Sequence, residues 1–203
     1  MVRLPQDQIL LELKPLTVEL LPAVVELDRL CFGNLWSLEG YERELRSINS
    51  DLLTLSCLDS FVKGSGSKVD KGVLVGLGCL WAILEEAHIT LVAVHPEYQH
   101  QGLGQLLMYA LLREAWRRGL ERATLELGAD NLAALSLYQK FGFAVAGRRR
   151  NYYPQNPQTG EDGLIMWRSG LNSPTFPDEL AHWQQQVGSR LRETGPYSVI
   201  DQL

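Results

Sequence analysis

The residues with the clearest chemical pattern form one stretch in the middle of the chain, where a strand-like run is followed by a turn, two glycines and a helix-like run. The strand-like run ends at Val94, and Pro96 prevents its simple continuation. The glycines are Gly102 and Gly104. Glycine lets the backbone approach a ligand closely, and the first N–H groups of a helix have no partner within the helix. Together with the positive end of the helix dipole, these groups make a site for an anion such as a pyrophosphate.

Other phosphate-binding motifs fit this stretch badly. A dinucleotide-binding fingerprint needs a third glycine where Leu107 stands, and a P-loop needs a Lys-Ser or Lys-Thr pair, which the stretch lacks. Taken alone, the glycine pair is also compatible with a plain turn that opens a helix. The pattern therefore indicates an anion site of another kind, or a turn without a ligand.

Two side chains further along the chain have the chemistry of a proton acceptor and a proton donor. Glu126 alternates with Leu125 and Leu127 in a strand-like run, so its carboxylate faces the opposite side of the strand. A carboxylate in a covered strand is costly unless it is paired or functional, so Glu126 is either a base or a partner of an arginine, for instance one in the preceding helix. Tyr138 follows Asn131 by two helical turns, which places both on one helix face about 10 Å apart. It is either an acid or a half-buried core residue.

The elements that must position these groups follow from hydrophobic periodicity and turn residues. Residues 59–72 hold a Gly/Ser-rich insert, which we expect to be a flexible hairpin loop. Beyond Gly170 the composition shifts, and we expect a domain over residues 1–170 followed by a linker and a short C-terminal helix within residues 171–203. The pattern predicts strands over residues 9–13, 51–58, 73–83, 89–94, 123–127, 143–146 and 164–167. It predicts helices over residues 17–30, after Ser37, at the glycine pair with apolar residues from Leu103 to Ala115, over residues 132–141 and around residues 180–191.

Composition excludes several classes of protein. The chain has 203 residues, of which 45% are hydrophobic and 21% are charged, as in an ordinary globular domain. Its net charge is −5, and the one basic run is short (residues 148–150), which argues against a direct nucleic-acid partner. Three widely spaced cysteines form neither a disulfide framework nor a metal motif, so we expect no metal. No apolar stretch is long enough for a membrane span and none resembles a leader, so we expect a cytoplasmic protein without a membrane partner.

The central stretch resembles the acetyl-coenzyme A signature of the GNAT superfamily. The resemblance extends over about residues 9 to 168 and includes the order of strands and helices. It rests on Gln99-x-x-Gly102-x-Gly104 after a V-A-V-x-P strand, on Asn131, and on the ending Leu137-Tyr138-x-x-x-Gly142-Phe143. Within the superfamily the chain is similar to the ribosomal-protein-alanine N-acetyltransferases, through Leu125-Glu126-Leu127, Asn151-Tyr152-Tyr153-Pro154 and Glu161-Asp162-x-x-x-Met166.

The resemblance implies a fold of the α/β (α+β) class, with a mixed, mostly antiparallel central sheet of about seven strands, about four flanking helices and, here, a C-terminal helical tail. It implies an enzyme that uses acetyl-coenzyme A to acetylate the N-terminal alanine of a small-subunit ribosomal protein by direct transfer. Glu126 is then the general base and Tyr138 the general acid. The residues implied to hold acetyl-coenzyme A are Val92, Ala93, Val94, His100, Gln101, Gly102, Leu103, Gly104, Gln105 and Asn131, and those implied to receive the peptide N-terminus are Tyr152, Tyr153 and Glu161.

Two alternative functions remain open. One is a protein N-terminal acetyltransferase of broader specificity. The other, from a different class, is a catalytically silent coenzyme A-binding module that acts through a partner. The presence of both Glu126 and Tyr138 argues against a silent module, which has no chemical need for either. Tyr152 and Tyr153 are also compatible with ordinary core or surface aromatics.

Overall fold

The computed structural model describes residues 9–58, 72–153 and 161–203, except for the side chains of residues 151–153 and 161. The Gly/Ser-rich insert expected over residues 59–72 lies outside this part of the chain, apart from its last residue.

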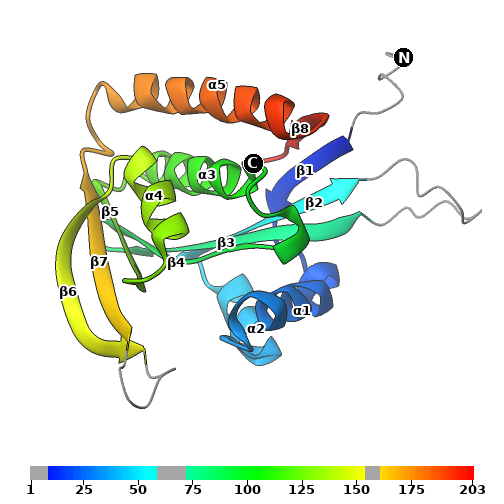
Figure 1. Ribbon diagram of the computed structural model, residues 1–203, viewed down its shortest axis with the longest axis horizontal. Helices are drawn as coiled ribbons and strands as arrows, with labels where there is room; N and C mark the ends of the chain where they lie inside the picture. Colours follow the sequence, from blue (N-terminus) through cyan, green and yellow to red (C-terminus); the bar gives the residue numbers. More distant parts are fainter. Residues whose placement is uncertain (1–8, 59–71, 154–160) are drawn as a thin grey trace, which may run out of the picture.

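One mixed sheet of eight strands forms the centre of the described residues, in the spatial order β6-β7-β5-β4-β3-β2-β1-β8 (Figure 1). Neighbouring strands are antiparallel except for β4 beside β5 and β1 beside β8, which are parallel. This arrangement confirms the expected α/β (α+β) class with a mostly antiparallel sheet. The strands are β1 (Ile9–Pro15), β2 (Ser50–Leu58), β3 (Val73–Ile83), β4 (Glu86–Val94), β5 (Arg122–Gly128), β6 (Ala144–Tyr153), β7 (Glu161–Ser169) and β8 (Tyr197–Asp201).

Helices cover both faces of this sheet. Helices α1 and α2 lie on one face, and α3 and α4 lie on the other, where α5 runs along the outer side of α3 (Figure 1). Each face has its own hydrophobic core, a smaller one under α1 and α2 and a larger one under α3. The helices are α1 (Leu21–Phe32), α2 (Leu38–Arg46), α3 (Leu103–Arg117), α4 (Leu132–Lys140) and α5 (Phe176–Thr194), with short 3₁₀ turns η1 (Val18–Leu20) and η2 (Pro96–Tyr98).

Helix α3 lies close against β3 because β3 carries two glycines beneath it. A Cβ at Gly76 would lie 3.0 Å from Leu107 Cδ1, and a Cβ at Gly78 would lie 3.0 Å from Leu111 Cδ1. Both leucines are fully buried. A larger residue at either glycine would therefore push α3 away from the sheet, since protein cores are close-packed. This contact fixes the start of α3, where the glycine pair lies, relative to β4.

The C-terminal segment is more extensive than the sequence pattern predicted. The expected short helix is α5, with 19 residues, and it buries Leu180, Trp183, Val187 and Leu191 in the α3 core. The unforeseen eighth strand, β8, pairs in parallel with β1. Only five residues long, it carries a strand pattern too short to recognise without its partner. The domain division at residue 170 stays a prediction.

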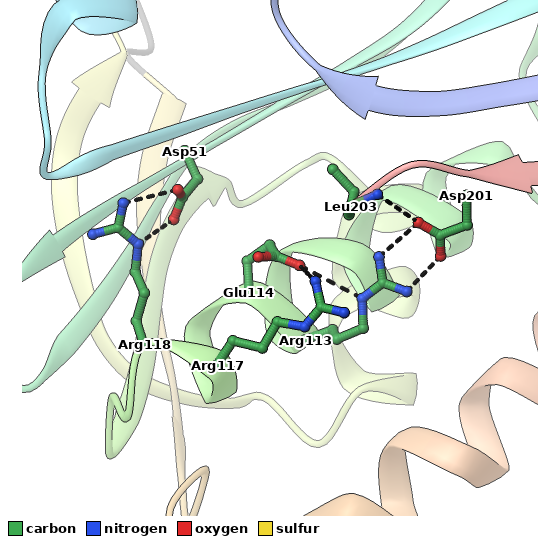
Figure 2. A network of polar contacts seen from close by, with 7 residues as sticks. All are labelled: Asp51, Arg113, Glu114, Arg117, Arg118, Asp201 and Leu203. Atoms are coloured by element: carbon green, nitrogen blue, oxygen red, sulfur yellow. Dashed lines mark hydrogen bonds and ion pairs between the residues drawn. The ribbon is translucent and has the colours of Figure 1, made fainter.

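Ion pairs fasten the end of the chain to α3 (Figure 2). The Asp201 carboxylate of β8 accepts hydrogen bonds from the Arg113 guanidinium, at 2.9 Å for Nη2, and from the Leu203 N–H at 3.2 Å. At the C-cap of α3, Arg118 Nε lies 2.6 Å from Asp51 Oδ2 of β2. Helix α3 is thus held to both β2 and β8 by charged contacts in addition to its apolar face.

Candidate functional site

A gap opens between β4 and β5, beside the strand that precedes the glycine pair. The parallel pairing of these two strands ends at Ile89 and Leu125, although β4 continues to Val94 and β5 to Gly128. On its other edge, the register of β4 with β3 shifts at Thr90, which is an extra residue and forms a β-bulge. A bulge bends its strand and increases the local twist, so β4 diverges from β5 beyond this point.

The bulge also exchanges the two faces of β4. Before it, Ile89 packs in the core under α3. After it, Leu91 and Ala93 pack in the core under α1 and α2, and Val92 contacts the α3 core instead. The strand is therefore covered on both faces, as its continuous apolar run predicted, but the alternation changes phase in the middle.

The divergence leaves backbone groups of β4 facing the gap. The His95 N–H donates a hydrogen bond to the Val75 carbonyl of β3 at 2.9 Å. Because the bonds of an antiparallel ladder alternate along the strand, Ala93 also turns its N–H and carbonyl toward β3. Val92 and Val94 turn theirs toward the gap, where β5 no longer pairs with them. The Val94 carbonyl accepts hydrogen bonds there from Gln99 Nε2 at 3.1 Å and from Cys31 Sγ at 3.4 Å. Such an edge can pair with an extended ligand that carries amide groups.

A cavity of about 1110 Å³ lies along this gap and brings together side chains from distant parts of the sequence. Its lining includes Thr90 and Val92 of β4, Glu126 of β5, Asn131 and Tyr138 of α4, Arg149 of β6, and Phe32 and Leu35 near the end of α1. The predicted base and the predicted acid therefore line one cavity.

Glu126 enters the cavity from the middle of β5. Its neighbours Leu125 and Leu127 are buried on the opposite face, whereas the Glu126 side chain is 32% exposed to solvent. Its Oε1 lies 3.1 Å from Nη1 of Arg149, whose side chain is 49% exposed. The ion pair is therefore present, but its arginine comes from β6 and not from the preceding helix. A pair this exposed is screened by water and holds the carboxylate only weakly.

Helix α4 supplies the other two predicted side chains. Asn131 is its N-cap, and its Oδ1 accepts a hydrogen bond from the Ala134 N–H at 3.0 Å. Tyr138 is 9% exposed, and its ring centroid lies 6.2 Å from that of Phe143. Tyr138 is thus both a core residue and part of the cavity lining, so the two readings of this tyrosine are compatible.

Two residues of the turn between β4 and α3 have a left-handed backbone conformation. Gly102 is the N-cap of α3 with φ 91°, and His100 has φ 62°. The N–H groups of Gln105 and Leu106 both donate to the Gly102 carbonyl, at 3.0 and 3.1 Å. The preceding N–H groups, including those of Leu103 and Gly104, come before the first intrahelical bond and so remain available to an anion. These turn residues lie beyond the end of the cavity lining.

The opposite end of the cavity carries charged groups that the sequence analysis did not select. Glu86 Oε1 accepts a hydrogen bond from Arg122 Nε at 2.7 Å, and this bond holds the pKa of Glu86 below its usual value. His88 Nε2 lies 3.0 Å from Glu86 Oε2. Trp167 of β7 also lines this end, with the Arg122 guanidinium 5.9 Å from its ring centroid.

A buried carboxylate shapes the wall formed by the connection between α1 and α2. Asp28 is fully buried and accepts hydrogen bonds from the Leu35 N–H at 2.6 Å, the Trp36 N–H at 3.2 Å and the Tyr41 hydroxyl at 2.6 Å. Burial, together with this bond to Asp28, raises the pKa of Tyr41. Three donors on one carboxylate explain how the charge is tolerated in the core, and they position Leu35 at the cavity.

The remaining predicted site residues belong to β6 and β7. Tyr152 and Tyr153 belong to β6 and Glu161 to β7, but their side chains lie outside the described part of the structure. The cavity residues that sequence reasoning missed include Phe32, Leu35, Glu86 and Arg149. They carry no local motif, and only the strand order brings Arg149 near Glu126.

Among the described residues, no group of three or more His, Cys, Asp or Glu side chains is arranged to hold a metal ion. In the same part of the chain, no helix combines the length and apolar character needed to cross a membrane.

Comparison with known proteins agrees with this geometry. The model of the family described as "Acetyltransferase (GNAT) family" matches residues 21–143. The [ribosomal protein bS18]-alanine N-acetyltransferase of Escherichia coli (strain K12) is 41% identical over 95 residues, which cover 47% of this chain and 64% of that protein. A relative in Bacillus subtilis (strain 168) is 40% identical over 96 residues, covering 47% of this chain and 62% of the relative. The matched region thus spans less than two thirds of either relative.

A solved structure extends the likeness over more of the fold. The crystal structure of the ribosomal-protein-S18-alanine N-acetyltransferase from Escherichia coli superposes with a TM-score of 0.64 and 29% identity. The superposition covers 78% of this chain and 93% of that one.

Proposed function

This chain belongs to the GNAT acetyltransferase family, and from that premise we propose that it transfers the acetyl group of acetyl-coenzyme A to the N-terminal alanine of ribosomal protein bS18. The observation that carries the proposal is the gap between β4 and β5, where an unpaired strand edge leads into a cavity lined by Glu126 and Tyr138. The relatives at 40% and 41% identity support the substrate, because the Escherichia coli protein is named for it.

Backbone groups of β4 and of the start of α3 can bind acetyl-coenzyme A. The Val92 N–H and carbonyl and the Val94 N–H pair with the amides of the pantetheine arm as a neighbouring strand would. The N–H groups at the start of α3 meet the pyrophosphate, helped by the helix dipole. Asn131 caps α4 beside this path, and its side-chain amide retains donors for the arm.

The proposed chemistry is a direct transfer within a ternary complex. Glu126 receives a proton from the α-ammonium, directly or through a water molecule, and the freed amine nitrogen forms a bond to the acetyl carbon. The carbon–sulfur bond then breaks, the Tyr138 hydroxyl donates its proton to the departing thiolate, and the nitrogen releases its second proton to water to give the neutral amide. A backbone N–H of β4 facing the gap is suited to the oxyanion of the intermediate.

An α-amine suits this site better than a lysine side chain. With a pKa of about 7.7 to 8.0, roughly a tenth to a fifth of an α-amine is neutral at pH 7, so a moderate base suffices. A lysine amine, with a pKa of about 10.4, is neutral only about once in a few thousand molecules. The cation nearest to Glu126 among the ion pairs of the cavity is the exposed Arg149, which is too well solvated to lower a lysine pKa by several units.

The test is acetyl transfer from acetyl-coenzyme A to a panel of peptides, read by mass. We expect a peptide with the alanine N-terminus of bS18 to be acetylated on its α-amine faster than peptides with other first residues. Equal rates across the panel would favour an N-terminal acetyltransferase of broader specificity. Labels on internal lysines with free N-termini would contradict the proposal, and coenzyme A binding without any transfer would favour the silent module.

Two variants separate the roles of the acid and the base. Glu126→Gln is expected to lower kcat at pH 7 by about 10²- to 10⁴-fold, with part of the rate recovered toward pH 9 as the amine deprotonates in solution. Tyr138→Phe is also expected to be slow, but alkaline pH does not rescue it. Glu85→Gln is the matched control, because Glu85 also pairs with an arginine, at 3.1 Å, but lies outside the cavity lining. Equal rescue of both cavity variants would refute the assignment.

A further inference from the structure

The C-terminal segment touches the turn that precedes α3 at three points. A Cβ built on Gly102 would lie 3.1 Å from Arg190 Cγ and 3.4 Å from Leu191 Cδ2, so α5 packs directly against this glycine. Thr194 Oγ1 lies 2.7 Å from the Gln101 carbonyl oxygen. The Tyr197 hydroxyl donates a hydrogen bond to Gln101 Oε1. The end of α5 and the start of β8 therefore meet the loop at two adjacent residues.

These contacts leave the Gln101 side chain facing the protein. Its Oε1 is held by Tyr197, and its Nε2 donates to the Glu97 carbonyl at 3.1 Å. Gln101 thus joins the turn to β8 and to η2. It was predicted to bind the cofactor, but its side chain is placed to support the turn from behind.

The Thr194 contact determines the direction of a peptide plane. In a trans peptide the carbonyl and the N–H point in opposite directions. With its carbonyl directed toward Thr194, the peptide between Gln101 and Gly102 must turn the Gly102 N–H away from α5. The Thr194 hydroxyl has one hydrogen, which is shared between two acceptors, the Gln101 carbonyl at 2.7 Å and the Arg190 carbonyl at 2.9 Å.

The supporting segment is itself anchored at both ends. Strand β8 pairs with β1 from Tyr197 opposite Ile9 to Asp201 opposite Leu13. At the start of α5, the buried Arg168 donates a hydrogen bond of 2.7 Å to Glu179 and lies 4.8 Å from the Trp183 ring centroid. An anchored segment can hold the turn in one geometry and so lowers the entropy lost when a ligand binds.

We propose that Thr194 and Tyr197 are positioning residues for the diphosphate of acetyl-coenzyme A, acting through the Gln101–Gly102 peptide. This inference rests on the proposed function. The segment that supplies both residues lies outside residues 21–143, which the family model matches. The C-terminal segment of this chain therefore adds a support behind the cofactor turn.

The test measures binding of coenzyme A by calorimetry, which requires no peptide substrate. Thr194→Val and Tyr197→Phe each remove one hydroxyl at nearly constant volume. We expect each to raise the Kd for coenzyme A by about 3- to 10-fold, as for the loss of one hydrogen bond. The KM for acetyl-coenzyme A should rise in parallel, with kcat and the KM for the peptide little changed. Thr194→Ser keeps the hydroxyl and should restore the wild-type Kd.

Thr54→Val is the matched control for loss of stability alone. Thr54 is fully buried, and its hydroxyl donates to the Lys14 carbonyl at 3.1 Å, between β1 and β2. We expect it to lower the melting temperature without changing the Kd for coenzyme A. The inference is overturned if Thr194→Val and Tyr197→Phe bind like wild type, if Thr54→Val weakens binding equally, or if Thr194→Ser fails to restore it. A wild-type protein that binds no coenzyme A would instead refute the proposed function.

Discussion

The buried carboxylate of Asp28 offers the sharpest test of how the cavity wall is held. Asp28→Asn replaces one carboxylate oxygen with an amide group that donates. Oδ2 accepts from both the Trp36 N–H and the Tyr41 hydroxyl, whereas Oδ1 accepts from the Leu35 N–H. An amide in either orientation therefore places a donor against at least one N–H donor, and the remaining bonds lose the assistance of the charge.

The expected loss follows from these contacts. Hydrogen bonds to charged groups contribute about 1.5 to 3 kcal/mol, and a buried donor left unsatisfied costs about 1 to 3 kcal/mol. One lost bond and two weakened ones give about 2 to 4 kcal/mol. An unfolding entropy of about 2.1 cal/mol/K per residue, over 203 residues, converts this loss into a fall in Tm of about 5 to 9 °C. Tyr41→Phe, which removes one bond only, should lower Tm by about 3 to 7 °C.

The assay combines calorimetric unfolding with steady-state kinetics. Because Asp28 positions Leu35 at the cavity, we expect Asp28→Asn to raise the KM for the peptide and to leave the Kd for coenzyme A near its wild-type value. A fall in Tm below about 1 °C would refute the account of the network. Coenzyme A binding weakened as strongly as the peptide KM would refute the prediction that the cavity wall at Leu35 contacts the peptide.

Three further predictions concern the turn, the C-terminus and a buried thiol. Gly102→Val, at φ 91°, should reduce the rise in Tm at saturating acetyl-coenzyme A, and an undiminished rise would contradict this. Burial raises the pKa of Asp201, but Arg113 and the Leu203 N–H lower it by more, so its stabilising effect is present above the unfolded pKa of about 3.9 and lost as pH falls through the folded pKa. The Tm difference between wild type and Asp201→Asn should therefore shrink from pH 7 to pH 3. Burial raises the pKa of Cys79 to about 12, so native-state alkylation at pH 8 should leave Cys79 unlabelled in a peptide mass map.

Local sequence was sufficient for the elements that carry the cofactor turn and the acid. Gly102 marks the start of α3, and Asn131 is the N-cap of α4. Both signals depend on a few neighbouring residues, because glycine tolerates positive φ and the asparagine side chain bonds to an N–H three residues ahead. The alternation around Glu126 likewise separated its partly exposed side chain from the buried Leu125 and Leu127.

Three features were decided only by the tertiary structure. The bulge at Thr90, which opens the gap, is a mismatch of register between β4 and β3 and exists only once the strands pair. The partner of Glu126 is Arg149 because the strand order places β7 next to β5 and β6 next to β7, so that the arginine of β6 reaches the carboxylate of β5. The support of Gln101 by Tyr197 joins residues far apart in the chain. Periodicity and motifs report only on neighbours along the chain, and these contacts depend on which elements pack together in space.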